Sequence, residues 1–213
     1  MTKRSRSAIP IAHAVTGFFE ELIHGLAAVE VTDAAGAPMR FYPGMVGAVE
    51  LIVDAHARGG KLLFVGNGAS AAIASHQAVD YWKTARIRAM AFNDAALLTC
   101  ISNDFGYASV FEKPLEMFAE ARDVLVAISS SGRSENIIRA AHAARGAGAR
   151  ILTFSGFAPD NPLRSLGDLN FYVPTKSYGQ VEVTHLSLSH CLLDAIVKVF
   201  GSPPTPPTGR TRR

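Results

Sequence analysis

The fold of this protein is decided by residues 123–134, which read Asp123-Val124-Leu125-Val126-Ala127-Ile128-Ser129-Ser130-Ser131-Gly132-Arg133-Ser134. The first half is a short, continuous apolar run, as found in parallel strands that are covered on both faces. Four serines and a glycine follow, and residues 134–146 then show the alanine-rich pattern of a helix. The stretch therefore predicts one strand–loop–helix unit of an α/β fold.

Similar units recur on both sides of this stretch. The apolar pattern predicts further strands over 61–65, 87–92, 150–154 and 169–173, and helices over 70–84, 95–102, 110–121 and 181–200. Two helices, over 9–30 and 43–58, are expected before the first strand, with a linker over 32–40 between them and a turn at 104–107 later in the chain. Together these elements predict an α/β three-layer sandwich with a mostly parallel five-stranded sheet and right-handed crossovers.

The composition describes one globular domain with short polar ends. Of the 213 residues, 48% are hydrophobic and 18% charged, so we expect a single domain over 9–201. Residues 1–8 are basic and residues 202–213 are rich in proline and arginine, and both segments are expected to be disordered. Each end carries three basic residues and no acidic one, so the net charge of +3 becomes about −3 once both ends are set aside. This distribution argues against a nucleic-acid-binding face.

The sequence favours a cytoplasmic protein. It shows no unbroken apolar run of membrane-spanning length and no secretory signal, so we expect no membrane partner. Cys100 and Cys191 are too few for a disulfide framework, and we interpret both as reduced core residues.

The serines that follow residues 123–128 predict an anion site. Ser129, Ser130, Ser131 and Ser134 offer hydroxyl donors next to the start of a helix, where unpaired backbone N–H groups and the helix dipole attract negative charge. The lysine of a P-loop is absent, so a nucleotide cofactor is not expected. A helix cap with a polar turn is the plainer alternative, although one or two serines would suffice for it.

A second loop joins a strand to a helix in the same way. Gly66-Asn67-Gly68-Ala69-Ser70 follows the apolar run 61–65. Ligands of open α/β sheets bind beyond the carboxyl ends of the strands, so both loops are expected to meet at one ligand.

Two helices carry groups suited to proton transfer or to a metal. His76 and Asp80 lie one turn apart on one helix face, and Glu182 and His190 lie on one stripe of the last helix. Two imidazoles and two carboxylates could move a proton between adjacent carbons or hold zinc, while a surface ion pair with solvated polar positions is the simpler alternative. His185 is a rival for His190. The remaining histidines, which show no cluster and are expected on the surface, are His13, His24, His56 and His142.

A further polar segment is Asn103-Asp104-Phe105-Gly106-Tyr107, within an otherwise apolar stretch. It suits either recognition of sugar hydroxyls or an Asx turn that caps the next helix.

These motifs, in this order, resemble the sugar isomerase (SIS) domain family and its phosphoheptose isomerase branch over residues 45–200. The resemblance rests on the loop 66–70, His76 with Asp80, the segment 102–106, the serine segment 128–134, and Glu182 through His190. It implies a flavodoxin-like SIS fold, a homotetramer with sites between subunits, and a sugar-phosphate isomerase of heptose biosynthesis. The implied reaction converts sedoheptulose 7-phosphate to D-glycero-D-manno-heptose 7-phosphate through an enediol.

The resemblance also assigns roles to residues. Ser129, Ser130, Ser131 and Ser134 would hold the phosphate, and Asn67, Gly68, Ala69, Ser70, Asn103, Asp104 and Glu182 would contact the sugar. Asp80 and His190 take the positions of the family's catalytic pair, Glu182 is a second candidate base, and His76, Asp80, Glu182 and His190 take the zinc positions. Asp80 and Glu182 replace a family Glu and Gln, and the loop 175–179 is shorter and lacks the family's acidic residue. These departures leave open a non-catalytic relative that binds a sugar phosphate or a protein partner of the replication-initiator-associating type.

Overall fold

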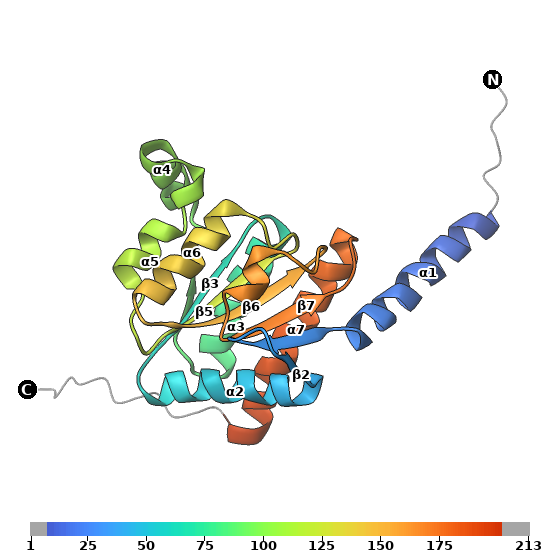
Figure 1. Cartoon of the computed structure of the whole chain (residues 1–213), viewed down its shortest axis with the longest axis horizontal. Helices are drawn as coiled ribbons and strands as arrows, with labels where there is room; N and C mark the ends of the chain where they lie inside the picture. The colour runs from blue at the N-terminus through green and yellow to red at the C-terminus, as the bar shows by residue number, and fades with distance from the viewer. Residues whose placement is uncertain (1–7, 202–213) are drawn as a thin grey trace, which may run out of the picture.

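A computed structural model describes residues 8–201 and arranges their strands in one seven-stranded sheet of order β2-β1-β7-β6-β5-β3-β4 (Figure 1). The expected tails over 1–8 and 202–213 lie outside the described residues, apart from Ala8. The strands are β1 (Glu30–Asp33), β2 (Pro38–Met39), β3 (Leu62–Gly66), β4 (Ala89–Ala91), β5 (Val124–Ser129), β6 (Arg150–Gly156) and β7 (Leu169–Val173). The helices are α1 (Ala8–Ala27), α2 (Phe41–Ala57), α3 (Ala69–Thr84), α4 (Ala95–Phe105), α5 (Glu112–Phe118), α6 (Glu135–Gly146) and α7 (Tyr178–Phe200), with short 3-10 turns η1 (Tyr107–Ser109) and η2 (Pro162–Ser165).

The five strands predicted from the sequence form the parallel part of the sheet. β3, β4, β5, β6 and β7 pair in parallel throughout. In chain order their spatial sequence is 2-1-3-4-5, which is the flavodoxin-like order. The chain therefore reverses its direction of winding between β3 and β5, and such a switch point opens a crevice between the two loops that leave those strands.

The expected count of five strands is wrong at one edge of the sheet. β1 runs antiparallel to β7, and β2 runs antiparallel to β1. The first helix ends at Ala27 rather than residue 30, and the expected linker over 32–40 is a hairpin. Its turn is closed by Oδ1 of Asp33, which accepts hydrogen bonds from the N–H groups of Ala35 and Ala37 at 2.9 Å each. Strands of four and two residues are too short to show a periodic signal.

Helices cover both faces of the sheet, as the three-layer prediction requires (Figure 1). Along β3, Leu62 and Phe64 pack with α2, α3 and α7, while Leu63 and Val65 pack with α5 and α6. Successive strand residues point to opposite faces, so a strand buried on both sides reads as a continuous apolar run.

The last helix has the length and hydropathy of a membrane span, with 39% of its most apolar window buried inside the protein. Val181, Leu188 and Ile196 join the core on one face of the sheet, and α7 packs against α1, α2 and α3. α7 is therefore part of the helical layer that packs on one face of the sheet.

Several local expectations are corrected. The helix expected over 110–121 is the shorter α5, which follows η1, and the expected turn at 104–107 is divided between the end of α4 and η1. Cys100 and Cys191 are free but exposed, because α4 buries no residue and Cys191 lines a surface pocket between α2 and α7. His56, expected on the surface, is only 6% exposed on the inner face of α2.

Candidate active site

A cavity of about 220 Å³ opens at the switch point between β3 and β5. It brings together both predicted loops and the start of α7. Its lining consists of Asn67, Gly68, Ala69, Ser70, Ser129, Ser130, Ser131, Ser134, Tyr178 and Glu182. All eight loop residues expected to bind substrate therefore share one cavity with Glu182.

The serine loop is held in a tight turn that leaves hydroxyl groups at the cavity. The Gly132 N–H donates to the carbonyl and to Oγ of Ser129, at 3.0 and 3.2 Å. Ser134 occupies the N-cap position of α6, yet its side chain caps no backbone N–H. Capping therefore does not account for Ser134, and the start of α6 keeps unpaired donors beside the cavity.

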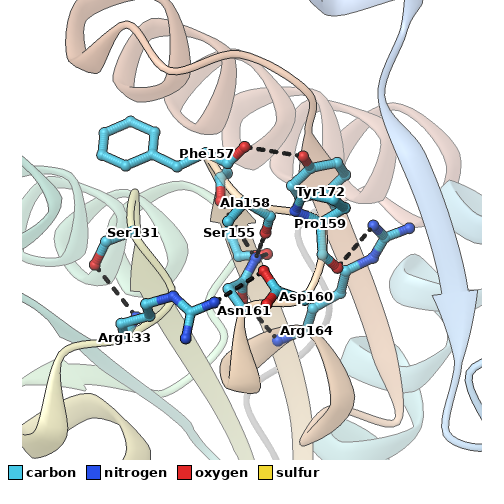
Figure 2. Close-up of polar contacts among 11 residues, drawn as sticks. Ser131, Arg133, Ser155, Phe157, Ala158, Pro159, Asp160, Asn161, Arg164 and Tyr172 are labelled. Carbon is cyan, nitrogen blue, oxygen red and sulfur yellow. Dashed lines mark hydrogen bonds and ion pairs between the residues drawn. The ribbon is translucent and has the colours of Figure 1, made fainter.

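Gly132 fits where no other residue would. Its φ is +61°, and a Cβ built there would lie 2.0 Å from Oδ1 of Asn161. Asn161 cannot easily yield, because its Nδ2 donates to the Ala158 carbonyl at 2.8 Å and its Oδ1 accepts from the Arg164 N–H at 3.1 Å. On the outer side of the loop, Arg133 pairs with Asp160 at 2.8 Å (Figure 2). The serine loop thus rests on the segment that follows β6.

The Asn67 amide is oriented by two residues that sequence reasoning missed. Its Oδ1 accepts hydrogen bonds from Asn136 Nδ2 and from the Tyr107 hydroxyl, at 2.9 Å each. Its Nδ2 donates to Asn136 Oδ1, also at 2.9 Å. The amide has one hydrogen left to donate, so Asn67 is a positioned donor at the cavity wall.

A second cluster lies further along α3 and α7, which pack against each other. Nε2 of His76 lies 3.2 Å from Oδ2 of Asp80, and the rings of His76 and His190 are 5.4 Å apart. Lys83 contacts the other carboxylate oxygen of Asp80 at 3.2 Å. Three of the four residues expected at the zinc positions therefore converge.

The donor set of this cluster fits a zinc ion. Ligand atoms of His76, Asp80 and His190 all lie within 4.8 Å of one another. Tetrahedral zinc with ligands near 2.1 Å needs them about 3.4 Å apart, which small side-chain rotations would achieve. Glu182, the fourth expected ligand, lies outside this cluster and lines the serine cavity instead.

His185, the rival of His190, is a core residue. Its side chain is fully buried, and its Nε2 lies 3.1 Å from the Ser155 carbonyl. Burial lowers the pKa of His185 to about 4, so the ring is neutral at pH 7. A neutral imidazole that bonds a carbonyl must donate through that nitrogen, which leaves His185 as a structural donor to β6.

Asn103 and Asp104 are exposed at the end of α4 and do not line the cavity. Their side chains bond each other, with Asn103 Nδ2 donating to Asp104 Oδ1 at 2.9 Å. In the described part of a single chain, Asn103 and Asp104 therefore lie apart from the other predicted site residues.

Comparison with known proteins agrees with this architecture. A family model described as the SIS domain matches residues 43–156. The phosphoheptose isomerase of Proteus mirabilis is 34% identical over 194 residues, which cover 84% of this chain and 97% of that protein. The structure of the phosphoheptose isomerase from Neisseria gonorrhoeae superposes with a TM-score of 0.77 at 30% identity, covering 87% of this chain and 99% of the other. The corresponding structure from Francisella tularensis gives 0.76 at 26% identity, with 93% and 100% covered.

The doubly wound sheet with its serine-lined crevice is thus a SIS domain. Within that class, the chain belongs to the phosphoheptose isomerase family.

Proposed function

We propose that this protein is an aldose–ketose isomerase that converts sedoheptulose 7-phosphate to D-glycero-D-manno-heptose 7-phosphate. One observation carries the proposal. A serine-lined cavity at the starts of α3, α6 and α7 lies beside a cluster of two histidines and an aspartate further along α3 and α7. The family membership of the chain supports the same substrate class.

The serine loop is suited to the phosphate group. Ser129, Ser130, Ser131 and Ser134 supply neutral donors, and the start of α6 adds N–H groups and the positive end of its dipole. The cavity opens at the first turns of α3 and α7, and the cluster lies about two to three turns further along both helices. A phosphate at the serines would therefore direct the other end of an extended sugar towards Asp80 and His190.

The reaction needs a base and a proton relay. A carboxylate removes the proton from C1 of the ketose, the resulting enediol is reprotonated at C2, and a second group moves a proton between the two oxygens. We assign the carboxylate role to Asp80, or to Glu182 at the cavity wall, and the relay to His190. Asn67 and Glu182 would bond the sugar hydroxyls.

Zinc fits the second cluster and is part of the proposal. His76, Asp80 and His190 would hold the ion, and zinc bound there would supply a Lewis acid for the substrate carbonyl. The protein groups still set the substrate's position and carry the protons.

We further propose a cytoplasmic homotetramer. The exposed apolar residues of α1, which projects away from the sheet in Figure 1, are Ile11, Val15, Phe18, Phe19 and Ile23. Such a stripe is suited to burial against another copy. A second copy would also give Asn103 and Asp104 a route to a neighbouring cavity.

The test is turnover of sedoheptulose 7-phosphate by the purified protein, with and without added zinc, followed by NMR. We expect an aldose heptose 7-phosphate to form and Asp80→Asn to abolish its formation. Asp54→Asn is the matched control, because Asp54 is an exposed helical aspartate in an i,i+4 ion pair with Arg58 on α2. Saturable binding of the sugar phosphate without turnover would instead support the non-catalytic alternative.

A further inference from the structure

Phe157, just after β6, has a backbone conformation that side chains normally avoid. Its φ is +62°, and among the described residues only Arg86 shares a positive φ without being glycine. Such positions cost folding free energy and persist where the surroundings hold them, often near functional sites.

Two hydrogen bonds hold the Phe157 backbone. Its N–H donates to the Thr175 carbonyl at 3.0 Å, and its own carbonyl accepts from the Tyr172 hydroxyl at 3.1 Å (Figure 2). Tyr172 is 3% exposed, and the Arg164 guanidinium lies 4.2 Å from the centre of its ring. Arg164 is itself fixed by an ion pair with Glu30 at 2.5 Å.

This conformation directs the Phe157 ring away from Tyr172, as Figure 2 shows. The ring meets Tyr178 edge to face, with centroids 4.7 Å apart and planes at 83°. Tyr178 lines the serine cavity and remains 62% exposed. A side chain this exposed has many orientations open to it unless a neighbour restricts them, and Phe157 is such a neighbour.

We propose that Phe157 is a positioning residue that holds Tyr178 as the wall for the carbon chain of the substrate. Tyr178 stands one turn before Glu182 on α7, whereas the phosphate donors lie on the loop after β5. An aromatic face packs against the C–H groups of a sugar, and its hydroxyl can bond a sugar hydroxyl. A phosphate gains little from an aromatic face, so the wall discriminates sugar phosphates rather than phosphate itself.

The identity of the ligand rests on the proposed function, whereas the role of the wall can be measured without turnover. The decisive variant is Phe157→Gly, because glycine adopts a positive φ readily, so the change removes the side chain without adding backbone strain. The ring also packs against the core, so the packing lost in Phe157→Gly opposes the backbone strain relieved, and we expect only a small change in thermal stability. We expect an increase in KM for sedoheptulose 7-phosphate of about two- to tenfold and an unchanged inhibition constant for inorganic phosphate. Phe157→Tyr, which keeps the ring, should restore the wild-type KM.

Arg86→Gly is the matched control, since Arg86 is exposed at φ +58° beyond the end of α3 and away from the cavity. It should relieve the same strain and leave KM unchanged. The proposal is overturned if Phe157→Gly and Arg86→Gly have the same KM. It is also overturned if Phe157→Gly weakens the binding of inorganic phosphate as much as the binding of the sugar phosphate. Calorimetric titration with both ligands repeats the comparison without catalysis. If the wild-type protein shows no turnover, the proposed isomerase is refuted. If Phe157→Gly then lowers the affinity for sedoheptulose 7-phosphate but not for inorganic phosphate, the role of Tyr178 as a wall is still supported.

Discussion

Nζ of Lys83 lies 3.2 Å from Oδ1 of Asp80, while Oδ2 of the same carboxylate faces Nε2 of His76 at the same distance. The carboxylate is therefore held from two sides, and one oxygen is directed at the histidine cluster. Lys83 thus places a positive charge directly beside the Asp80 carboxylate.

Lys83→Met should lower kcat by about tenfold while KM changes little, because a carboxylate displaced by a fraction of an ångström transfers protons poorly. The Lys83 side chain is 61% exposed, so the ion pair contributes less than about 1 kcal/mol to folding. Steady-state kinetics and thermal unfolding of the same preparations check both expectations. Lys113→Met removes a similar i,i+3 ion pair, with Glu116, and is the control. Equal kcat values for the two variants would contradict the role of Lys83.

Zinc should bind the cluster on α3 and α7. We expect His76→Ala to lower the affinity for zinc by at least about tenfold, because losing even a residue that only hydrogen-bonds to a metal ligand has an effect of that size. Titration of metal-free protein with zinc and a competing indicator measures the affinity directly. His24→Ala removes an exposed histidine of α1 and should leave the affinity unchanged. If the two variants bind zinc equally well, the ion is held elsewhere.

Gly132→Ala should damage both the fold and the anion site. Its methyl group would overlap the anchored Asn161, in addition to the strain at φ +61°. Gly36→Ala is the control for strain alone, because Gly36 has φ +78° with open space around it. We expect a loss of about 1–2 kcal/mol for Gly36→Ala and at least about 2 kcal/mol more for Gly132→Ala. Chemical denaturation gives both values, and only Gly132→Ala should lose inorganic phosphate binding. Equal losses would show that Asn161 yields.

The parallel sheet and its two loops could be predicted because buried strands such as 123–128 are apolar without interruption. Their loops then gather at one sheet edge by topology alone, which is why Asn67 and Ser131 were expected to share a ligand. The hairpin of β1 and β2 could not be predicted, since its residues pair with β7 more than 130 positions away.

The finer parts of the site depend on contacts between distant residues. Tyr178 was missed because its place in the cavity follows from packing against Phe157, which no periodicity reveals. His185 and His190 occupy different faces of α7, and only the packed structure shows that His185 faces the sheet while His190 faces His76.

His185 should also make the fold sensitive to acid. Its pKa is about 4 in the folded protein, against 6.5 ordinarily, so between these values the unfolded chain binds the proton that the folded chain refuses. The contribution of His185 to stability is therefore complete above about pH 6.5 and falls as the pH drops to about 4, by about 3 kcal/mol in all. His185→Gln can still donate to the Ser155 carbonyl but cannot titrate, so its free energy of unfolding should fall less steeply over this range. Denaturation at several pH values measures the slope, and His142→Gln, an exposed change on α6, should keep the wild-type slope. Parallel curves for His185→Gln and the wild type would mean that the buried imidazole accepts a proton within the fold.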